Sequence, residues 1–112
     1  MQLPVDLDEG QEKILRLFVG DDVEAASHDG VLESLSLVVS LSAYSRWDDD
    51  LRLVLNGRRL RGEMGNGRLR FENAPVRQGL NELTIRLRRR GGRVPLKPVR
   101  VQGVEVFIDY RM

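Results

Sequence analysis

Apolar residues recur at every second position through much of this chain, which is the pattern of strands buried on one face. A short example lies in residues 51–60, where leucines occupy alternate positions: Leu51, Leu53 and Leu55. Asn56 and Gly57 follow them, and this pair favours the positive φ angles of a tight hairpin turn. Because the next residues can begin a return strand, the sequence predicts a β-hairpin here.

A longer strand is predicted over residues 34–43, where aliphatic residues alternate with serine. The apolar positions are Leu35, Leu37, Val39, Leu41 and Ala43, and the polar positions are Ser34, Ser36, Ser40 and Ser42. A helix would scatter both sets around its circumference, whereas a strand places them on opposite faces. We therefore expect one face in the core and a serine-rich outer face.

Three further strands follow the same period, in residues 69–71, 83–87 and 99–110. In the last of these strands the apolar positions change from odd to even numbers at Gln102 and Gly103. An extra residue in one strand of an antiparallel pair produces such a change, so the sequence predicts a β-bulge at this point.

The remaining segments are short or rich in turn residues. Residues 14–19 are almost continuously apolar, which favours a short strand buried on much of both faces. Residues 62–67 contain three glycines and are expected to form a loop. Residues 1–12 hold Pro4, Gly10 and several acids with little to bury, so we expect a flexible lead-in and ordered structure from about Lys13.

Together these segments make seven to eight strands, with turn signals about every 8–12 residues and no convincing helical period. The sequence therefore predicts an all-β fold, a single antiparallel β-sandwich, over residues 13–112. One domain of this size buries roughly two thirds of the surface that its unfolded chain exposes, which is enough for one core.

Composition excludes several classes of protein. The 112 residues contain no cysteine, so disulfides, thiolate metal sites and cysteine nucleophiles are excluded. No apolar run approaches the roughly 20 residues that span a bilayer, so no membrane contact is expected. Residues 1–11 lack the basic and apolar regions of a signal peptide. A signal for export would therefore lie outside this chain. An extracytoplasmic location is expected only if the chain is part of a secreted protein.

Charge is unevenly distributed, although the net charge is only +1. Residues 1–50 contain 12 acidic and 3 basic side chains, and residues 51–112 contain 5 acidic and 15 basic ones. In a sandwich whose first and last strands are neighbours, the two halves can attract each other, by about 0.2–1 kcal/mol for each exposed pair. The alternative is an anionic partner for the basic half, but the near-neutral total argues against nucleic acid.

Three segments carry a resemblance to a known family. They are Leu-Arg-Leu-Val-Leu-Asn-Gly from Leu51, Gly-Leu-Asn-Glu-Leu-Thr-Ile from Gly79, and Val-Glu-Val-Phe-Ile-Asp-Tyr from Val104. In this order they resemble galactose-binding-like jelly-roll domains, which are accessory β-sandwiches of glycoside hydrolases and other secreted bacterial enzymes. The resemblance implies a jelly-roll fold and a carbohydrate ligand. No binding residue carries over, because the matching motifs are structural.

The candidate sugar site is formed by Tyr44, Arg46 and Trp47. Stacking on a pyranose needs an exposed flat ring, and charged neighbours can bind its hydroxyls. The alternative, which the usual burial of tryptophan favours, is that Trp47 closes one end of the sandwich. Arg86 and Arg88 are further candidate ligand-binding residues, since alternation places both on one outward face. They can bind an acidic polysaccharide or a partner's carboxylates, although a solvated face or pairing with the acidic half is favoured.

Asp48, Asp49 and Asp50 are candidate ligands for a structural calcium ion, because this cation prefers carboxylate oxygens. Asp21 and Asp22 can join them. The spacing matches no defined calcium loop, so a solvated acidic turn is the favoured interpretation. No other cofactor is expected.

Catalysis is not expected from this sequence. His28 is the only histidine and lies in the turn-like group Ser27-His28-Asp29-Gly30. A Ser-His-Asp string that is adjacent in sequence cannot adopt triad geometry.

Two functional hypotheses follow from the sequence. The first is a non-catalytic accessory module that binds a carbohydrate or packs against a neighbouring catalytic domain. The second is a structural or protein-interaction domain, with homo-oligomerisation through the serine-and-valine face of residues 34–42 or through an exposed strand edge.

Overall fold

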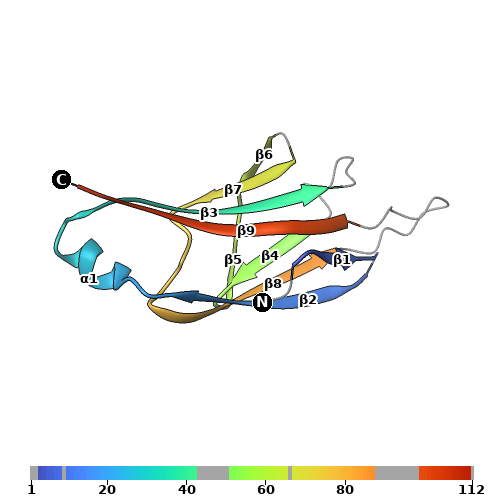
Figure 1. The fold of residues 1–112 in the computed structure, drawn as a ribbon, viewed down its shortest axis with the longest axis horizontal. Coiled ribbons are helices and arrows are strands. Elements are labelled where there is room, and N and C mark those ends of the chain that lie inside the picture. The colour runs from blue at the N-terminus through green and yellow to red at the C-terminus, as the bar shows by residue number, and fades with distance from the viewer. Residues whose placement is uncertain (1–2, 9, 43–50, 66, 88–98, 112) are drawn as a thin grey trace.

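The computed structural model describes residues 3–8, 10–42, 51–65, 67–87 and 99–111. In these ranges the chain forms nine strands and one short helix, and Figure 1 shows their arrangement. The strands are β1 (Val5–Leu7), β2 (Glu12–Val19), β3 (Leu32–Ser42), β4 (Leu51–Leu55), β5 (Arg58–Arg59), β6 (Glu63–Gly65), β7 (Arg68–Glu72), β8 (Gly79–Leu87) and β9 (Val99–Tyr110). The helix is α1 (Val23–His28).

The strands form two antiparallel sheets that pack together. One sheet has the order β1-β9-β3-β7-β6, and the other has the order β2-β8-β4-β5. The chain crosses repeatedly between them, because β2, β4 and β8 lie in the second sheet while β3, β7 and β9 lie in the first. This is the predicted all-β sandwich, and its strand order is compatible with a jelly roll.

The inner faces of both sheets share one hydrophobic core. Leu37 of β3, Leu53 of β4 and Ile85 of β8 are buried there, and the half-buried Val106 of β9 packs against them. Their neighbours in sequence point to the other face of each sheet. The two-residue period of the sequence therefore predicts the core correctly.

Two local predictions are confirmed. The β4–β5 connection is a tight hairpin turn in which Asn56 and Gly57 have φ angles of 51° and 83°. The bulge lies in β9, where Ser40 of β3 pairs with Gly103 but Leu41 pairs with Val101. Gln102 is thus the extra residue, and it shifts the inward face of β9 from odd to even positions.

Three short elements differ from the predictions. Within the expected lead-in, Val5–Leu7 form β1 because Leu7 reaches the core, where it is fully buried, while the strand pairs with β9. The glycine-rich segment contains β6, which pairs with β7. Helix α1 is too short to show a helical period in the sequence. The Asp22 side chain caps it by accepting a hydrogen bond from the backbone N–H of Ala25 at 3.0 Å.

The first and last strands are neighbours, and opposite charges meet between them. Arg100 Nε of β9 donates to Asp6 Oδ1 of β1 at 2.8 Å, and both side chains are exposed. The hydrogen bond from Arg100 lowers the pKa of Asp6 below its ordinary value. This pair joins the acidic and basic halves of the chain as the charge pattern predicts. Across the described ranges, no helix is long and apolar enough to cross a membrane.

Candidate functional site

Most of the predicted ligand residues lie outside the described residues. This applies to the sugar-site candidates Tyr44, Arg46 and Trp47, to Arg88, and to the calcium candidates Asp48, Asp49 and Asp50. The residues that border these two segments are neighbours, since Leu51 pairs with Leu87 across β4 and β8.

Of the residues predicted to bind a saccharide or a partner's carboxylates, Arg86 is the one that the structure describes. It lies on β8 with its side chain exposed on the outer face of the four-stranded sheet. Its cross-strand neighbours are Arg52 on β4 and Glu12 on β2. The row therefore combines two guanidinium groups with one carboxylate, which moderates its positive charge.

Asp21 and Asp22, the other calcium candidates, have local structural contacts. The Asp22 carboxylate caps α1, and the Asp21 carboxylate accepts a hydrogen bond from the hydroxyl of Tyr110. That bond raises the pKa of Tyr110. Within the part of the chain that the structure describes, no three metal-ligating side chains of His, Cys, Asp or Glu gather into one site.

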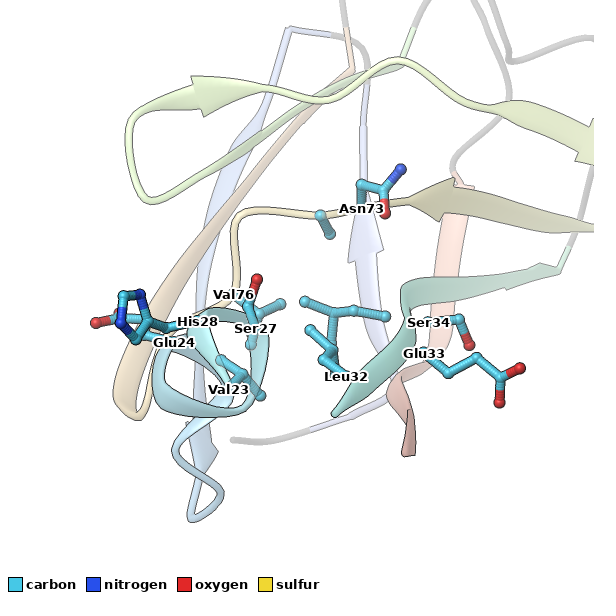
Figure 2. A pocket seen from close by; sticks show the side chains of 11 residues that line it. Val23, Glu24, Ser27, His28, Leu32, Glu33, Ser34, Asn73 and Val76 are labelled. Atoms are coloured by element: carbon cyan, nitrogen blue, oxygen red, sulfur yellow. The ribbon is translucent and has the colours of Figure 1, made fainter. Parts of the chain in front are cut away.

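A pocket of about 630 Å³ lies between α1 and the start of β3, as Figure 2 shows. The residues that line it are Val23, Glu24, Ser27, His28, Leu32, Glu33, Ser34, Leu35, Asn73, Ala74 and Val76. Its buried members are aliphatic, and its polar members are exposed or half-buried. His28 and Glu33 lie on opposite sides of it, so these two groups do not converge.

The chemistry of this pocket is that of a hydrogen-bonding site with an apolar floor. Glu24 and Glu33 supply acceptors, Ser27 and Ser34 supply hydroxyls, and Asn73 supplies an amide. Its volume falls within the usual range for small-molecule sites. The structure places His28 at the C-terminal end of α1, in the last turn of a helix rather than in the predicted turn.

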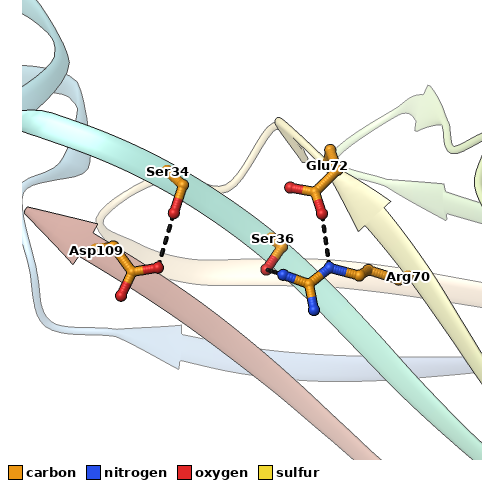
Figure 3. Close-up of polar contacts among 5 residues, drawn as sticks. All are labelled: Ser34, Ser36, Arg70, Glu72 and Asp109. Atoms are coloured by element: carbon orange, nitrogen blue, oxygen red, sulfur yellow. Dashed lines mark hydrogen bonds and ion pairs between the residues drawn. The ribbon is translucent and has the colours of Figure 1, made fainter.

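The serine-rich outer face of β3 is present, but its polar groups bind one another (Figure 3). Ser34 Oγ donates to Asp109 Oδ2 of β9 at 2.7 Å. Arg70 Nε of β7 donates to Glu72 Oε1 at 2.6 Å, and its Nη2 donates to Ser36 Oγ at 3.5 Å. Ser36 is buried beneath these longer side chains. The hydroxyls of Ser34 and Ser36 therefore have partners within the molecule.

One side of the sandwich has two open strand edges. β2 is the edge strand of the four-stranded sheet, and β9 pairs with β1 only over Val99 to Val101. Beyond Val101, the described residues supply β9 with a partner on its β3 side alone. An apolar groove of about 480 Å³ lies between these two edges. It is lined by Arg16, Leu17, Phe18, Val19, Val104, Val106 and Ile108.

Large apolar side chains are exposed beside this groove. Phe18 of β2 is 75% exposed, and Leu80 of β8, directly opposite it, is 58% exposed. Ile14 lies on the same outer face of β2 and is 51% exposed. Between them, Arg16 Nε lies 3.7 Å from Glu82 Oε1 in an exposed ion pair. We call the groove together with Phe18 and Leu80 the open side of the sandwich.

Sequence reasoning missed this surface for two reasons. The apolar run at residues 14–19 is predicted to be buried on much of both faces, which is wrong, because the outer face of the four-stranded sheet is uncovered at the exposed Ile14 and Phe18. The strand predicted over residues 83–87 begins earlier, at Gly79, so Leu80 lies on β8. The available signal was that Leu80 continues the outward, even-numbered row of β8.

Comparison with known proteins does not add a function. No protein-family model matches the chain, and no curated protein matches its sequence.

Proposed function

We propose that this chain is a non-catalytic β-sandwich module that binds another polypeptide through its open side. The observation that carries the proposal is the cross-strand pair of Phe18 and Leu80, exposed on the outer face beside the groove between β2 and β9. Scattered exposed apolar residues are normal, but a group of them beside a groove is typical of an interaction surface.

The energetics support a protein partner. Removal of a large apolar side chain from water contributes about 1.5–3 kcal/mol, so Phe18 and Leu80 together can supply a substantial part of a binding free energy. Aromatic residues are also enriched among the residues that dominate protein interfaces. The exposed ion pair of Arg16 and Glu82 beside them is suited to the polar rim of such an interface.

The test is site-specific photocrosslinking in cells that express the protein. A photoreactive benzoylphenylalanine replaces Phe18 in one variant and Arg58 in a control variant. Arg58 is an exposed residue of β5, the opposite edge strand of the same sheet. The proposal predicts a discrete crosslinked polypeptide from position 18 and none from position 58. Equal crosslinking from both positions, or none from position 18, would contradict it.

A second candidate function is glycan binding by an accessory domain of a larger secreted enzyme, which is what the galactose-binding-like resemblance implies. The pocket beside α1 favours it, because its volume suits a small saccharide and its polar members can bind hydroxyls. The intrinsic fluorescence of Trp47, the only tryptophan, tests the sugar site predicted from the sequence. Glycan binding there predicts a red-shifted emission that moves on addition of glycans. An emission that no glycan changes counts against that site.

The pocket beside α1 needs its own variant, because it involves the first residues of β3 whereas Trp47 follows the last ones. Glu33→Gln removes a charged acceptor from the pocket. The exposed Glu72→Gln on β7 is its matched control. Loss of glycan-array binding in the first variant alone would support the pocket as the site.

A further inference from the structure

We propose that the occupant of the open side is an extended strand that pairs antiparallel with β9 beyond Val101. Its alternate side chains would be apolar where they enter the groove and basic where they face outward beside β9. This inference rests on the proposed function, for which it specifies the kind of partner.

The strand β9 itself shows the effect of a neighbouring strand. Where β1 pairs with it, Val99 and Val101 are fully buried, and so is Leu7, which β1 contributes. Beyond β1, the inward residues Val104 and Val106 are only half-buried, although they belong to the same strand and face the same core. The difference follows from the short length of β1, which accompanies β9 only over Val99 to Val101. A strand that continued along β9 would cover Val104 and Val106 in the same way.

Two strand edges that could pair with an added strand border the groove. Its two rims are the edges of β9 and β2, whose backbone N–H and C=O groups on the open side have no strand partner within the described ranges. β1 already runs antiparallel to β9, with Val5 opposite Val101. A strand in the same direction over residues 104–110 would extend this pairing and place alternate side chains against Leu17, Val19 and Val106.

The exposed side chains of β9 determine which outward side chains the added strand should carry. Glu105, Phe107 and Asp109 form the outward row of β9 and are all exposed. Directly opposite residues in an antiparallel pair interact, so lysine or arginine is favoured opposite Glu105 and Asp109, and an aromatic residue opposite Phe107. A second copy of β9 fits less well, because a two-fold pairing centred on Phe107 would place Glu105 opposite the acidic Asp109 of that copy.

A designed peptide tests this directly on the intact protein. The probe is Val-Lys-Val-Tyr-Val-Lys-Val with a fluorescent label, and its affinity is measured by fluorescence polarisation. One control peptide has the same residues in an order without alternation. Another carries Glu in place of Lys, and a third is N-methylated at alternate residues, which removes backbone donors while the protein stays unchanged.

The matched protein variants are Val106→Lys in the groove and Val54→Lys on β4, since both valines are half-buried on strands. We expect the alternating peptide to bind, each control peptide to bind at least about tenfold more weakly, and Val106→Lys alone to lose binding by a similar factor. Equal affinity for the non-alternating or N-methylated peptides would overturn the inference, as would full affinity in Val106→Lys.

The two proposals fail in different ways. If the alternating peptide does not bind but the photoreactive residue at position 18 still crosslinks to a polypeptide, strand addition is wrong and the protein-binding function stands. If position 18 crosslinks no more than position 58, the proposed function itself is wrong.

Discussion

Asn56 Nδ2, in the turn between β4 and β5, donates a hydrogen bond to Asn81 Oδ1 of β8 at 2.8 Å. The two residues belong to the two asparagine-containing segments on which the galactose-binding-like resemblance rests. Asn81 is fully buried, and its Oδ1 also accepts from the backbone N–H of Arg77 at 2.8 Å. Its Nδ2 donates to the carbonyl oxygens of Arg77, Gly79 and Leu17. These motifs thus connect β2, β8 and the hairpin turn, which is a structural role.

The first prediction concerns this network. Asn81→Ala removes a fully buried side chain and leaves several partly buried partners without a hydrogen bond, so we expect a loss of about 2–4 kcal/mol in the free energy of unfolding. Urea denaturation measures it. The control is Gln78→Ala, which removes one exposed hydrogen bond to the carbonyl of Gly20 and should cost less than about 1 kcal/mol. Similar losses in both variants would contradict the role of Asn81.

The second prediction compares two isoleucines. Ile85 of β8 is fully buried, whereas Ile14 of β2 points outward and is 51% exposed. Ile85→Ala should therefore reduce the free energy of unfolding by about 2–5 kcal/mol, and Ile14→Ala by less than about 1 kcal/mol. Thermal and urea unfolding of both variants check this. A larger loss for Ile14→Ala would mean that the outer face of β2 is packed within the domain.

The third prediction concerns acid stability. The hydrogen bond from Arg100 lowers the pKa of Asp6 in the folded protein below its ordinary value of 3.8. The folded state therefore favours the ionised carboxylate. The resulting stabilisation is present above about pH 4 and is lost as the pH falls through the lowered pKa. Asp6→Asn should thus show a smaller loss of stability between pH 5 and pH 2 than the unchanged protein, in urea unfolding at each pH. An identical pH dependence in both would show that the pair does not contribute.

The fourth prediction compares two glycines: Gly62, which directly precedes β6, and Gly103 of β9. A Cβ at Gly62 would lie 2.3 Å from the carbonyl oxygen of Arg70 and 2.5 Å from Cδ1 of Phe71. Gly62→Ala should therefore destabilise the fold by about 1–3 kcal/mol, because the backbone must shift. At Gly103, beside the bulge, a Cβ would meet only Ser40 at 3.9 Å, so Gly103→Ala should be tolerated within about 1 kcal/mol. The reverse order of stabilities in thermal unfolding would contradict this packing.

The sequence predicts the parts of this fold that depend on alternation and turn chemistry. Leu37, Leu53 and Ile85 face the core as expected, and the turn at Asn56 and the bulge at Gln102 lie where the pattern places them. These features are local, because side-chain period and the φ preference of a turn residue depend on a few neighbouring positions.

The open side could not be predicted, because it depends on which strands are neighbours. Phe18 is exposed because it lies on the uncovered outer face of the four-stranded sheet, and Val106 is half-buried where β1 no longer accompanies β9, beyond the pair of Val5 and Val101. Neither fact can be read from the residues around these positions. The predicted aromatic sugar site around Trp47 stays a prediction, since it lies outside the described residues.

The most direct test of this account is amide hydrogen exchange along β9 in the free protein, measured by NMR. An open edge leaves alternate N–H groups without a strand partner. We predict slow exchange at Arg100 and Val101, which lie between β1 and β3, and alternating slow and fast exchange over residues 104–110. Uniformly slow exchange along the whole strand would show that this edge is already covered, and would contradict the open side on which the proposed function depends.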